Sequence, residues 1–198
     1  QAEILLIKNG EILDDTFSQG KWQTSSDKLV AKGPGHERAA SKTIAKGDFT
    51  IKARLSIKEL KSTASGFMLG GNLFGFDNRS GKFFLEGNDF PNKSLPKTSS
   101  FLKSHKDFDL TVTRKSSKLS FLINGKKLTS FTFHNKKVSS FGLRPHRNEM
   151  KISSLSIEGN LIGAPKLDYV FACGEEGHKS YRIPSIIRTK KGTLLAFA

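Results

Sequence analysis

Alternation of apolar and polar residues is clearest between Asp48 and Lys58. Five apolar side chains fall on one face of an extended chain, at Phe49, Ile51, Ala53, Leu55 and Ile57. The positions between them are all polar or charged. A period of two over this length predicts a β-strand with one buried and one solvated face, which is typical of an antiparallel sheet.

The run 107–133 repeats this alternation and predicts the centre of the fold. Its apolar residues alternate over 108–112 and again over 119–123, and Lys115-Ser116-Ser117 breaks the pattern as a turn. Asn124-Gly125 predicts a type I′ hairpin, because both residues tolerate the positive φ that this turn requires. Three antiparallel strands with one apolar face need a second sheet to cover that face, so we expect a sandwich.

One later strand changes phase part-way along its length. Met150 and Ile152 fall on one face, whereas Leu155 and Ile157 fall on the other. A slip of one residue restores a common face, so the pattern predicts a β-bulge near Ser153-Ser154.

Two further stretches have less regular patterns. Gly66–Asp77 is apolar but interrupted by glycines, and glycine inside a strand indicates a bulge or the close approach of another group. Residues 88–100 are polar and contain two prolines, which predicts a loop. Gly163-Ala164-Pro165 ends the series of strands, so we expect the sandwich to occupy residues 1–163.

The charge and cysteine content of the chain narrow the classes of partner. The formal net charge is +15, which attracts polyanions of any kind. The positive residues are mostly scattered lysines, and this favours a solvated lysine-rich surface over a nucleic-acid site. Cys173 is the single cysteine, so an intramolecular disulfide and a cysteine metal site are excluded. We expect no metal, no cofactor, no nucleic-acid partner and no membrane span.

Four runs along the chain resemble a known class of domain. They are FTIKARLSI, FGFD followed by GKFF, FDLTVTRKSSKLSFLING and FGLRPHRNEMKISSLSIEGN, and they are similar to segments of concanavalin A-like and laminin-G-like domains. The resemblance covers about residues 1–163. It implies an all-β fold, an antiparallel jelly-roll sandwich of the lectin-like kind.

The last stretch of the chain resembles a different family. Tyr181-Arg182-Ile183-Pro184, flanked by VFACGEEG and SIIRTKKGTLLAFA, is similar to the opening of the catalytic β-propeller of bacterial sialidases. By this resemblance residues 164–198 are the first strands of an incomplete propeller. Arg182 is then one of the arginines that hold the carboxylate of sialic acid through two parallel hydrogen bonds. Spacing alone favours a surface arginine beside an acidic neighbour, whereas the motif and its flanks favour the substrate-binding role.

The sequence does not supply the rest of a sialidase active site. The family uses an acidic general acid/base, a tyrosine nucleophile paired with a glutamate, and further arginines. The resemblance therefore implies a chain that is catalytically inactive by itself and belongs to a longer enzyme. The tail carries apolar side chains that need burial, so we expect it either to pair with an edge of the sandwich or to exchange between two chains and form a dimer.

Four residues of the sandwich are candidates for glycan binding. Trp22, the only tryptophan, is expected either to stack on a sugar ring or to pack half-buried against the first strands. Arg144, His146 and Arg147 occupy a basic turn beside Pro145, which is expected either to clamp a carboxylate or to form a solvated hairpin loop.

These features lead to one principal hypothesis of function and two alternatives. The principal hypothesis is a non-catalytic carbohydrate-binding module of a sialidase that hydrolyses terminal sialic acid, with sialylated or other acidic glycans as partners. Such an enzyme is expected to be secreted, periplasmic or on the cell surface. The alternatives are a laminin-G-like adhesion module that binds acidic polysaccharide and a structural brace without a ligand.

Overall fold

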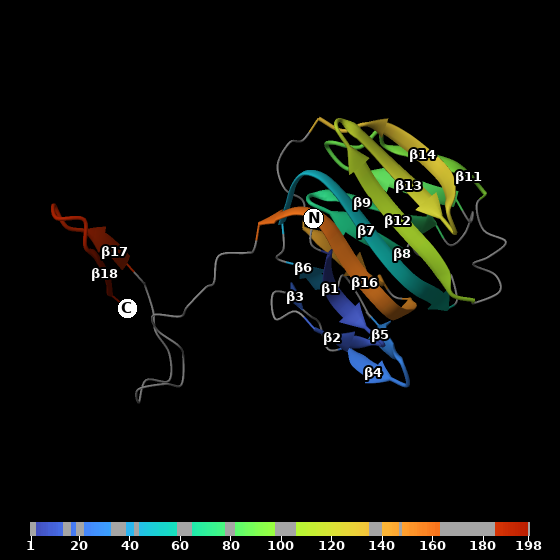
Figure 1. Cartoon of the computed structure of the whole chain (residues 1–198), viewed down its shortest axis with the longest axis horizontal. Coiled ribbons are helices and arrows are strands. Elements are labelled where there is room, and N and C mark those ends of the chain that lie inside the picture. The colour runs from blue at the N-terminus through green and yellow to red at the C-terminus, as the bar shows by residue number, and fades with distance from the viewer. Residues whose placement is uncertain are drawn as a thin grey trace. The chain divides into compact units, whose positions relative to one another are not determined.

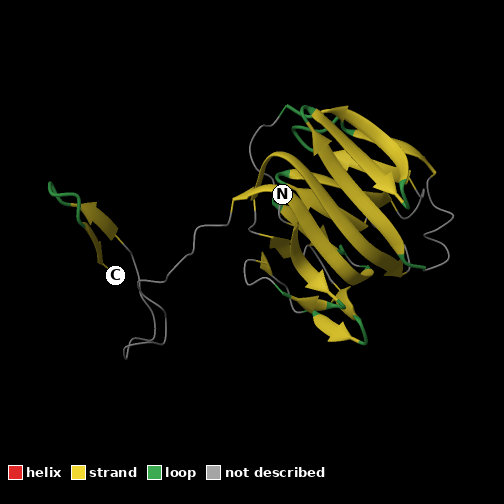
Figure 2. Ribbon diagram, viewed as in Figure 1, coloured by secondary structure: helices red, strands yellow, loops and turns green. Residues whose placement is uncertain are grey.

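All the regular structure that is described is β-strand, as the sequence pattern predicts (Figure 2). The computed structural model of the chain describes residues 3–13, 17–18, 22–32, 39–41, 44–58, 65–77, 82–97, 106–134, 140–146, 148–162 and 185–197. The chain divides into two compact units, Gln1–Ala164 and Pro165–Ala198. Within the described ranges there is no helix that is long and apolar enough to cross a membrane.

The first unit contains two antiparallel sheets that face each other (Figure 1). The larger sheet has the strand order β14 (Lys126–Thr132), β13 (Lys118–Ile123), β12 (Phe108–Lys115), β7 (Ile44–Lys58), β16 (Glu149–Ile162), β1 (Glu3–Lys8) and β2 (Glu11–Ile12). The short hairpin β4 (Gln23–Ser25) and β5 (Lys28–Lys32) also joins β16. One edge of β16 is therefore shared by β1 and β5 in succession.

The smaller sheet lies behind the larger one in the view of Figure 1. Its strand order is β11 (Lys93–Lys97), β10 (Lys82–Glu86), β9 (Asn72–Asp77), β8 (Ser65–Leu69), β15 (Phe141–Arg144), β6 (Ala39–Ser41) and β3 (Phe17–Ser18). The two-sheet sandwich that the alternating pattern predicts is therefore confirmed.

The centre of the larger sheet is the pair β7–β16, and not the run 107–133 that the sequence suggested. That run does form three antiparallel strands, but they extend the sheet to its edge at β14. β7 and β16 are the longest strands, with 15 and 14 residues, so they share the most backbone hydrogen bonds. The type I′ turn is confirmed, with φ of 48° at Asn124 and 76° at Gly125.

The predicted bulge in β16 is also confirmed. Ile152 pairs with Leu55 of β7 and Ser154 pairs with Arg54, which leaves Ser153 as the extra residue. The slip brings Leu155 back to the face that carries Ile152, and both side chains are fully buried. The bulge at this change of phase therefore keeps one face of the long strand apolar.

Two stretches differ from their sequence predictions. Gly66–Asp77 is not one strand but the hairpin β8–β9, which turns at Gly70-Gly71. Residues 93–97, which were expected to lie in a loop, form β11. Among the described strands β11 pairs only with β10. It contains Pro96, which an edge strand tolerates because one of its sides makes no ladder bonds.

The core between the sheets is built mainly from phenylalanine rings. Phe74 of the smaller sheet meets Phe121 of the larger sheet edge-to-face, with ring centroids 4.8 Å apart. Phe76 meets Phe108 in the same manner at 5.7 Å. Edge-to-face contacts between large rings let the two sheets interlock while they exclude water from the interior.

The turn glycine Gly125 offers a first test of the fold. Replacing Gly125 with alanine is expected to lower the free energy of unfolding by about 1 kcal/mol, since its φ of 76° is costly for any residue with a Cβ. Nothing lies within 4 Å of the added methyl group, so packing does not contribute. The control is Gly71→Ala, where the space is equally open and φ is ordinary. Equal losses for both variants in urea denaturation contradict the turn assignment.

The second unit contains one described hairpin, β17 (Ser185–Arg188) and β18 (Leu194–Phe197). The turn near Gly192, where φ is 89°, agrees with the sequence pattern. Ile186 and Ile187 are 71% and 50% exposed in this hairpin. Its assignment to a propeller, and the tail-mediated dimer, stay predictions.

Candidate functional site

The outer face of the smaller sheet carries a row of residues that the strand register aligns. Ser94 of β11 lies opposite Phe84 of β10, and Phe84 lies opposite Gly75 of β9. Gly75 then lies opposite Gly66 of β8, and Gly66 lies opposite Arg144 of β15. Directly opposed residues share a face of the sheet. Five strands thus place an aromatic residue and an arginine on either side of two glycines.

The two glycines open the space into which the Phe84 ring extends. A Cβ atom on Gly66 would lie 3.4 Å from Cζ of Phe84 and 3.1 Å from the carbonyl oxygen of Phe74. Phe84 therefore reaches across Gly75 to Gly66 and stays half-buried on the outer face. The neighbours Phe83 and Leu85 point inward and belong to the core. This is the close approach that glycines inside an apolar strand indicate.

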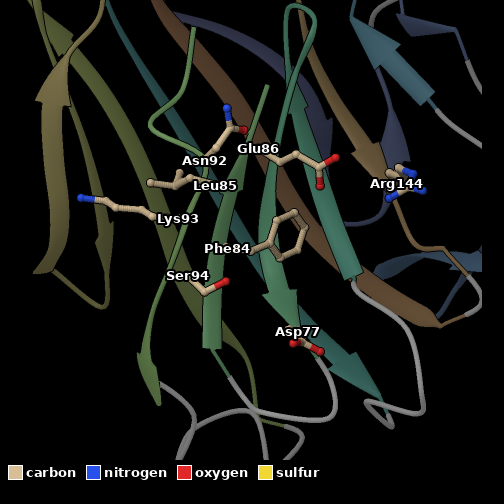
Figure 3. Close-up of a pocket in the computed structure, with 8 residues that line it drawn as sticks. All are labelled: Asp77, Phe84, Leu85, Glu86, Asn92, Lys93, Ser94 and Arg144. Carbon is tan, nitrogen blue, oxygen red and sulfur yellow. The ribbon is translucent and has the colours of Figure 1, made fainter. Parts of the chain in front are cut away.

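A cavity of about 400 Å³ lies over this ring (Figure 3). Its polar lining comes from six residues: Asp77, Glu86, Asn92, Lys93, Ser94 and Arg144. Figure 3 shows the carboxylates of Glu86 and Asp77 beyond opposite edges of the Phe84 ring, with Arg144 across from it. The register gives the same arrangement, because Asp77 pairs with Lys82, two residues before Phe84, and Glu86 lies two residues after it.

A turn of hydrogen-bonded residues fixes the end of the cavity that holds Asn92. The Asn92 side-chain oxygen accepts from the backbone N–H of Gly87 at 2.8 Å, and its amide donates to the Gly87 carbonyl at 3.1 Å. Asn72, which is 2% exposed, donates to the carboxylate of Asp89 and accepts from the Asp89 backbone N–H, both at 3.0 Å. Asp89 is therefore engaged within the protein.

Removal of the Asn72 side chain is expected to lower the free energy of unfolding by about 1–3 kcal/mol, because buried polar groups lose their partners. Asn72→Ala should also weaken the binding of any ligand that occupies the cavity, since the turn that carries Asn92 loses its link to β9. Chemical denaturation and a binding titration measure the two effects. Gln23→Ala, an exposed amide on β4, is the control and should change neither quantity.

The structure brings one of the sequence-predicted residues to this cavity. Arg144 ends β15 and lines it, while His146 follows two residues later with a φ of 45° and is half-buried. Trp22 is 8% exposed and packs in the core, which favours its alternative role against the first strands over sugar stacking. Arg147 and Arg182 lie outside the described residues.

Most of the remaining cavity residues were not predicted from the sequence. Phe84 belongs to a Phe-Phe pair, and alternation places only one of the two rings in the core. Glu86 has the pattern of an ordinary strand end, whereas Asp77 begins the polar run 77–80, which the sequence offers as a weaker candidate for glycan binding. The available signal was the combination of Phe83-Phe84 with the glycines of the preceding strands. Across the described ranges no three His, Cys, Asp or Glu residues gather in a group that could hold a metal ion.

Comparison with solved structures identifies the kind of fold. Trypanosoma rangeli sialidase superposes with a TM-score of 0.60 and 12% identity, over 82% of this chain and 30% of its own. Arcelin-5, a lectin-like defence protein from Phaseolus vulgaris, gives a TM-score of 0.56 and 14% identity, over 78% of this chain and 97% of its own. The shared fold is an antiparallel β-sandwich. The carbohydrate-binding module CBM66 from Bacillus subtilis gives 0.55 and 13%, over 73% and 96%.

The fraction of each known structure that superposes on this chain shows how far the likeness extends. Arcelin-5 and CBM66 are matched over almost their whole lengths, so the likeness of fold extends over nearly all of those two chains. The chain spans only 30% of the length of the trypanosomal sialidase. No protein-family model and no curated protein matches the sequence. At these identities the likeness concerns the fold, and function must be argued from the cavity.

Proposed function

We propose that the sandwich is a carbohydrate-binding module and that the Phe84 cavity is its binding site. The observation that carries this proposal is the half-buried ring of Phe84, laid over two glycines and surrounded by polar side chains. A pyranose has an apolar C–H face and a rim of hydroxyl groups. The C–H face packs on an aromatic ring, while carboxylate, amide and guanidinium groups bind the hydroxyls.

The dimensions of the cavity agree with this ligand class. Its volume of about 400 Å³ suits one or two sugar rings, and ligand pockets in general begin at about 300 Å³. The polar groups come from four different strands and the 87–92 turn, so they are held by a rigid sheet and its hydrogen-bonded turn. Such preorganisation reduces the entropy that binding costs.

The parent protein is proposed to be a sialidase. Two observations support this, namely the Tyr181-Arg182-Ile183-Pro184 motif with its flanks and the likeness of the sandwich to part of a trypanosomal sialidase. In this proposal Arg182 grips the carboxylate of sialic acid, and the enzyme works outside the cytoplasm on sialylated glycans. The chain of 198 residues is expected to release nothing from a fluorogenic sialoside. Release above background contradicts that expectation.

The net charge of +15 favours one alternative function. A laminin-G-like adhesion module would bind acidic polysaccharide through its basic surface, without using the cavity. Such binding weakens steeply with salt, because screening acts on exposed charges. A sandwich that binds no glycan would instead serve as a structural brace.

A glycan array probed with the chain at 0.1 M and 0.5 M salt (about 10 Å and under 5 Å Debye length) separates these functions. Binding to defined glycans that survives the higher salt supports a cavity of the lectin type. Binding only to sulfated or polyanionic glycans that disappears in the higher salt supports the adhesion module. No binding under either condition overturns the carbohydrate-binding proposal and leaves the brace.

A further inference from the structure

The Phe84 side chain lies along the sheet and does not stand off from it. Phe84 on β10 and Gly66 on β8 flank Gly75 on β9, so their Cα atoms are two strand spacings, or about 10 Å, apart. Cζ of Phe84 nevertheless lies 3.4 Å from the position that a Cβ atom on Gly66 would take. A side chain perpendicular to the sheet would keep its ring above its own strand. The ring of Phe84 therefore crosses β9 and ends beside β8.

One face of this ring covers the two glycines, and the other face lines the cavity. Gly66 and Gly75 are buried, whereas Phe84 is half-buried. Figure 3 looks onto a face of the ring, with the polar side chains of the cavity around it. The face is the electron-rich side of an aromatic ring, so it attracts the C–H groups of a sugar more than the ring edge does. Phe84 thus offers to the cavity the part of the ring that stacking needs.

Space, and not backbone conformation, requires a glycine at position 66. The φ of Gly66 lies outside the left-handed region, so its backbone accepts residues that have a side chain. A Cβ atom there would meet Cζ of Phe84 at an ordinary contact distance. An atom beyond Cβ would extend about 1.5 Å further, into the space that the ring occupies. The ring therefore tolerates a methyl group at position 66 but not a larger side chain.

We propose that Gly66 is a positioning residue of the glycan site, and that the bound sugar ring lies parallel to the sheet, above β9. The proposal rests on the carbohydrate-binding function given above and assigns the orientation of the ligand in that site. Gly66 does not touch the sugar but acts through Phe84. With a bulky residue at position 66, the Phe84 ring would rise from the sheet, turn its edge toward the ligand and fill part of the cavity.

The test compares two substitutions at one position, Gly66→Ala and Gly66→Val. Both add a Cβ atom 3.1 Å from the carbonyl oxygen of Phe74, so both carry the same strain against β9 and should unfold at similar temperatures. Only valine adds two further carbons, which compete with the ring of Phe84 for space. Gly66→Val should weaken glycan binding by at least about tenfold, as for the loss of a central aromatic contact. Gly66→Ala should weaken it by about threefold or less.

The probe is the methyl glycoside of the glycan that gives the strongest Phe84-dependent signal on the array, titrated by calorimetry. Gly71→Val is the matched control, since Gly71 lies on the same hairpin with nothing within 4 Å of its Cβ position, and it should not change the affinity. Gly66→Val should cost no further affinity in a Phe84→Ala protein, because no ring remains to be displaced. Gly66→Ser, with one atom beyond Cβ, should fall between alanine and valine, and it replaces valine if Gly66→Val does not fold.

Three results would overturn the proposal. The first is a folded Gly66→Val protein with wild-type affinity, and the second is equal weakening by alanine and valine (or serine). The third is a loss caused by Gly66→Val that persists in full in the Phe84→Ala protein, because the effect then does not pass through the ring. In each case Phe84-dependent binding would still stand. If no glycan shows Phe84-dependent binding, the proposed function itself is overturned, so the two failures are distinguishable.

Discussion

Replacing Phe74 with alanine is expected to lower the free energy of unfolding by about 3–5 kcal/mol. The ring is fully buried at the centre of the aromatic core. It contacts five other rings, those of Phe67, Phe83, Phe90, Phe121 and Phe141, at centroid distances from 4.8 to 6.4 Å. Its removal leaves a void between the two sheets that rigid neighbours fill only in part. A loss of this size is a large share of the stability of an ordinary domain.

Urea denaturation followed by fluorescence or circular dichroism measures this loss. Phe74→Leu should cost less, because leucine fills part of the same volume. Phe131→Ala, which removes a partly exposed ring from the edge strand β14, is the matched control and should cost clearly less than Phe74→Ala. Similar losses at Phe74 and Phe131 contradict the central position given to Phe74.

Replacing Phe84 with alanine is expected to weaken glycan binding by at least about tenfold, as for a central aromatic contact in a binding site. The ring forms the floor of the cavity, and no other lining residue of that cavity is aromatic. Because Phe84 points to the outer face, its loss should change the unfolding midpoint far less than the loss of Phe74. The expected pattern is therefore a binding defect in a stable protein.

Isothermal titration with a glycan chosen from the array measures this effect, and thermal unfolding checks the fold. Phe131→Ala is again the control, since it removes a partly exposed ring from the other sheet. Phe84→Tyr should keep most of the affinity, because the ring face remains. Unchanged affinity in a folded Phe84→Ala protein places any glycan binding elsewhere on the molecule.

Features that depend on neighbouring residues were predictable from the sequence. The face of β7, the Asn124-Gly125 turn and the bulge at Ser153 each follow from a local pattern of side chains. The physical reason is that strand period, turn φ and phase change act within a few residues. The sequence also predicted the second sheet, because the apolar face of the first sheet must be covered.

The cavity was not predictable in the same way. Phe84 and Arg144 lie far apart in the sequence and share a face only because three strand pairs align them through Gly75 and Gly66. Arg144 was a candidate because of its charge, but the other residues that line the cavity belong to no common sequence motif. For Trp22 the residue type allowed either a sugar platform or packing against the first strands, and an exposure of 8% favours packing.

The long strand β16 has a mechanical consequence. It pairs with β7 from Glu149 opposite Lys58 to Ile162 opposite Ile44, and the first unit ends soon after, at Ala164. Tension between a glycan held by the sandwich and the second unit therefore pulls along a central strand. Antiparallel ladder bonds lie perpendicular to their strands, so such a pull loads them together in shear. An edge strand pulled from one end would lose its ladder bonds one at a time, whereas the ladder bonds of β16 resist the pull together.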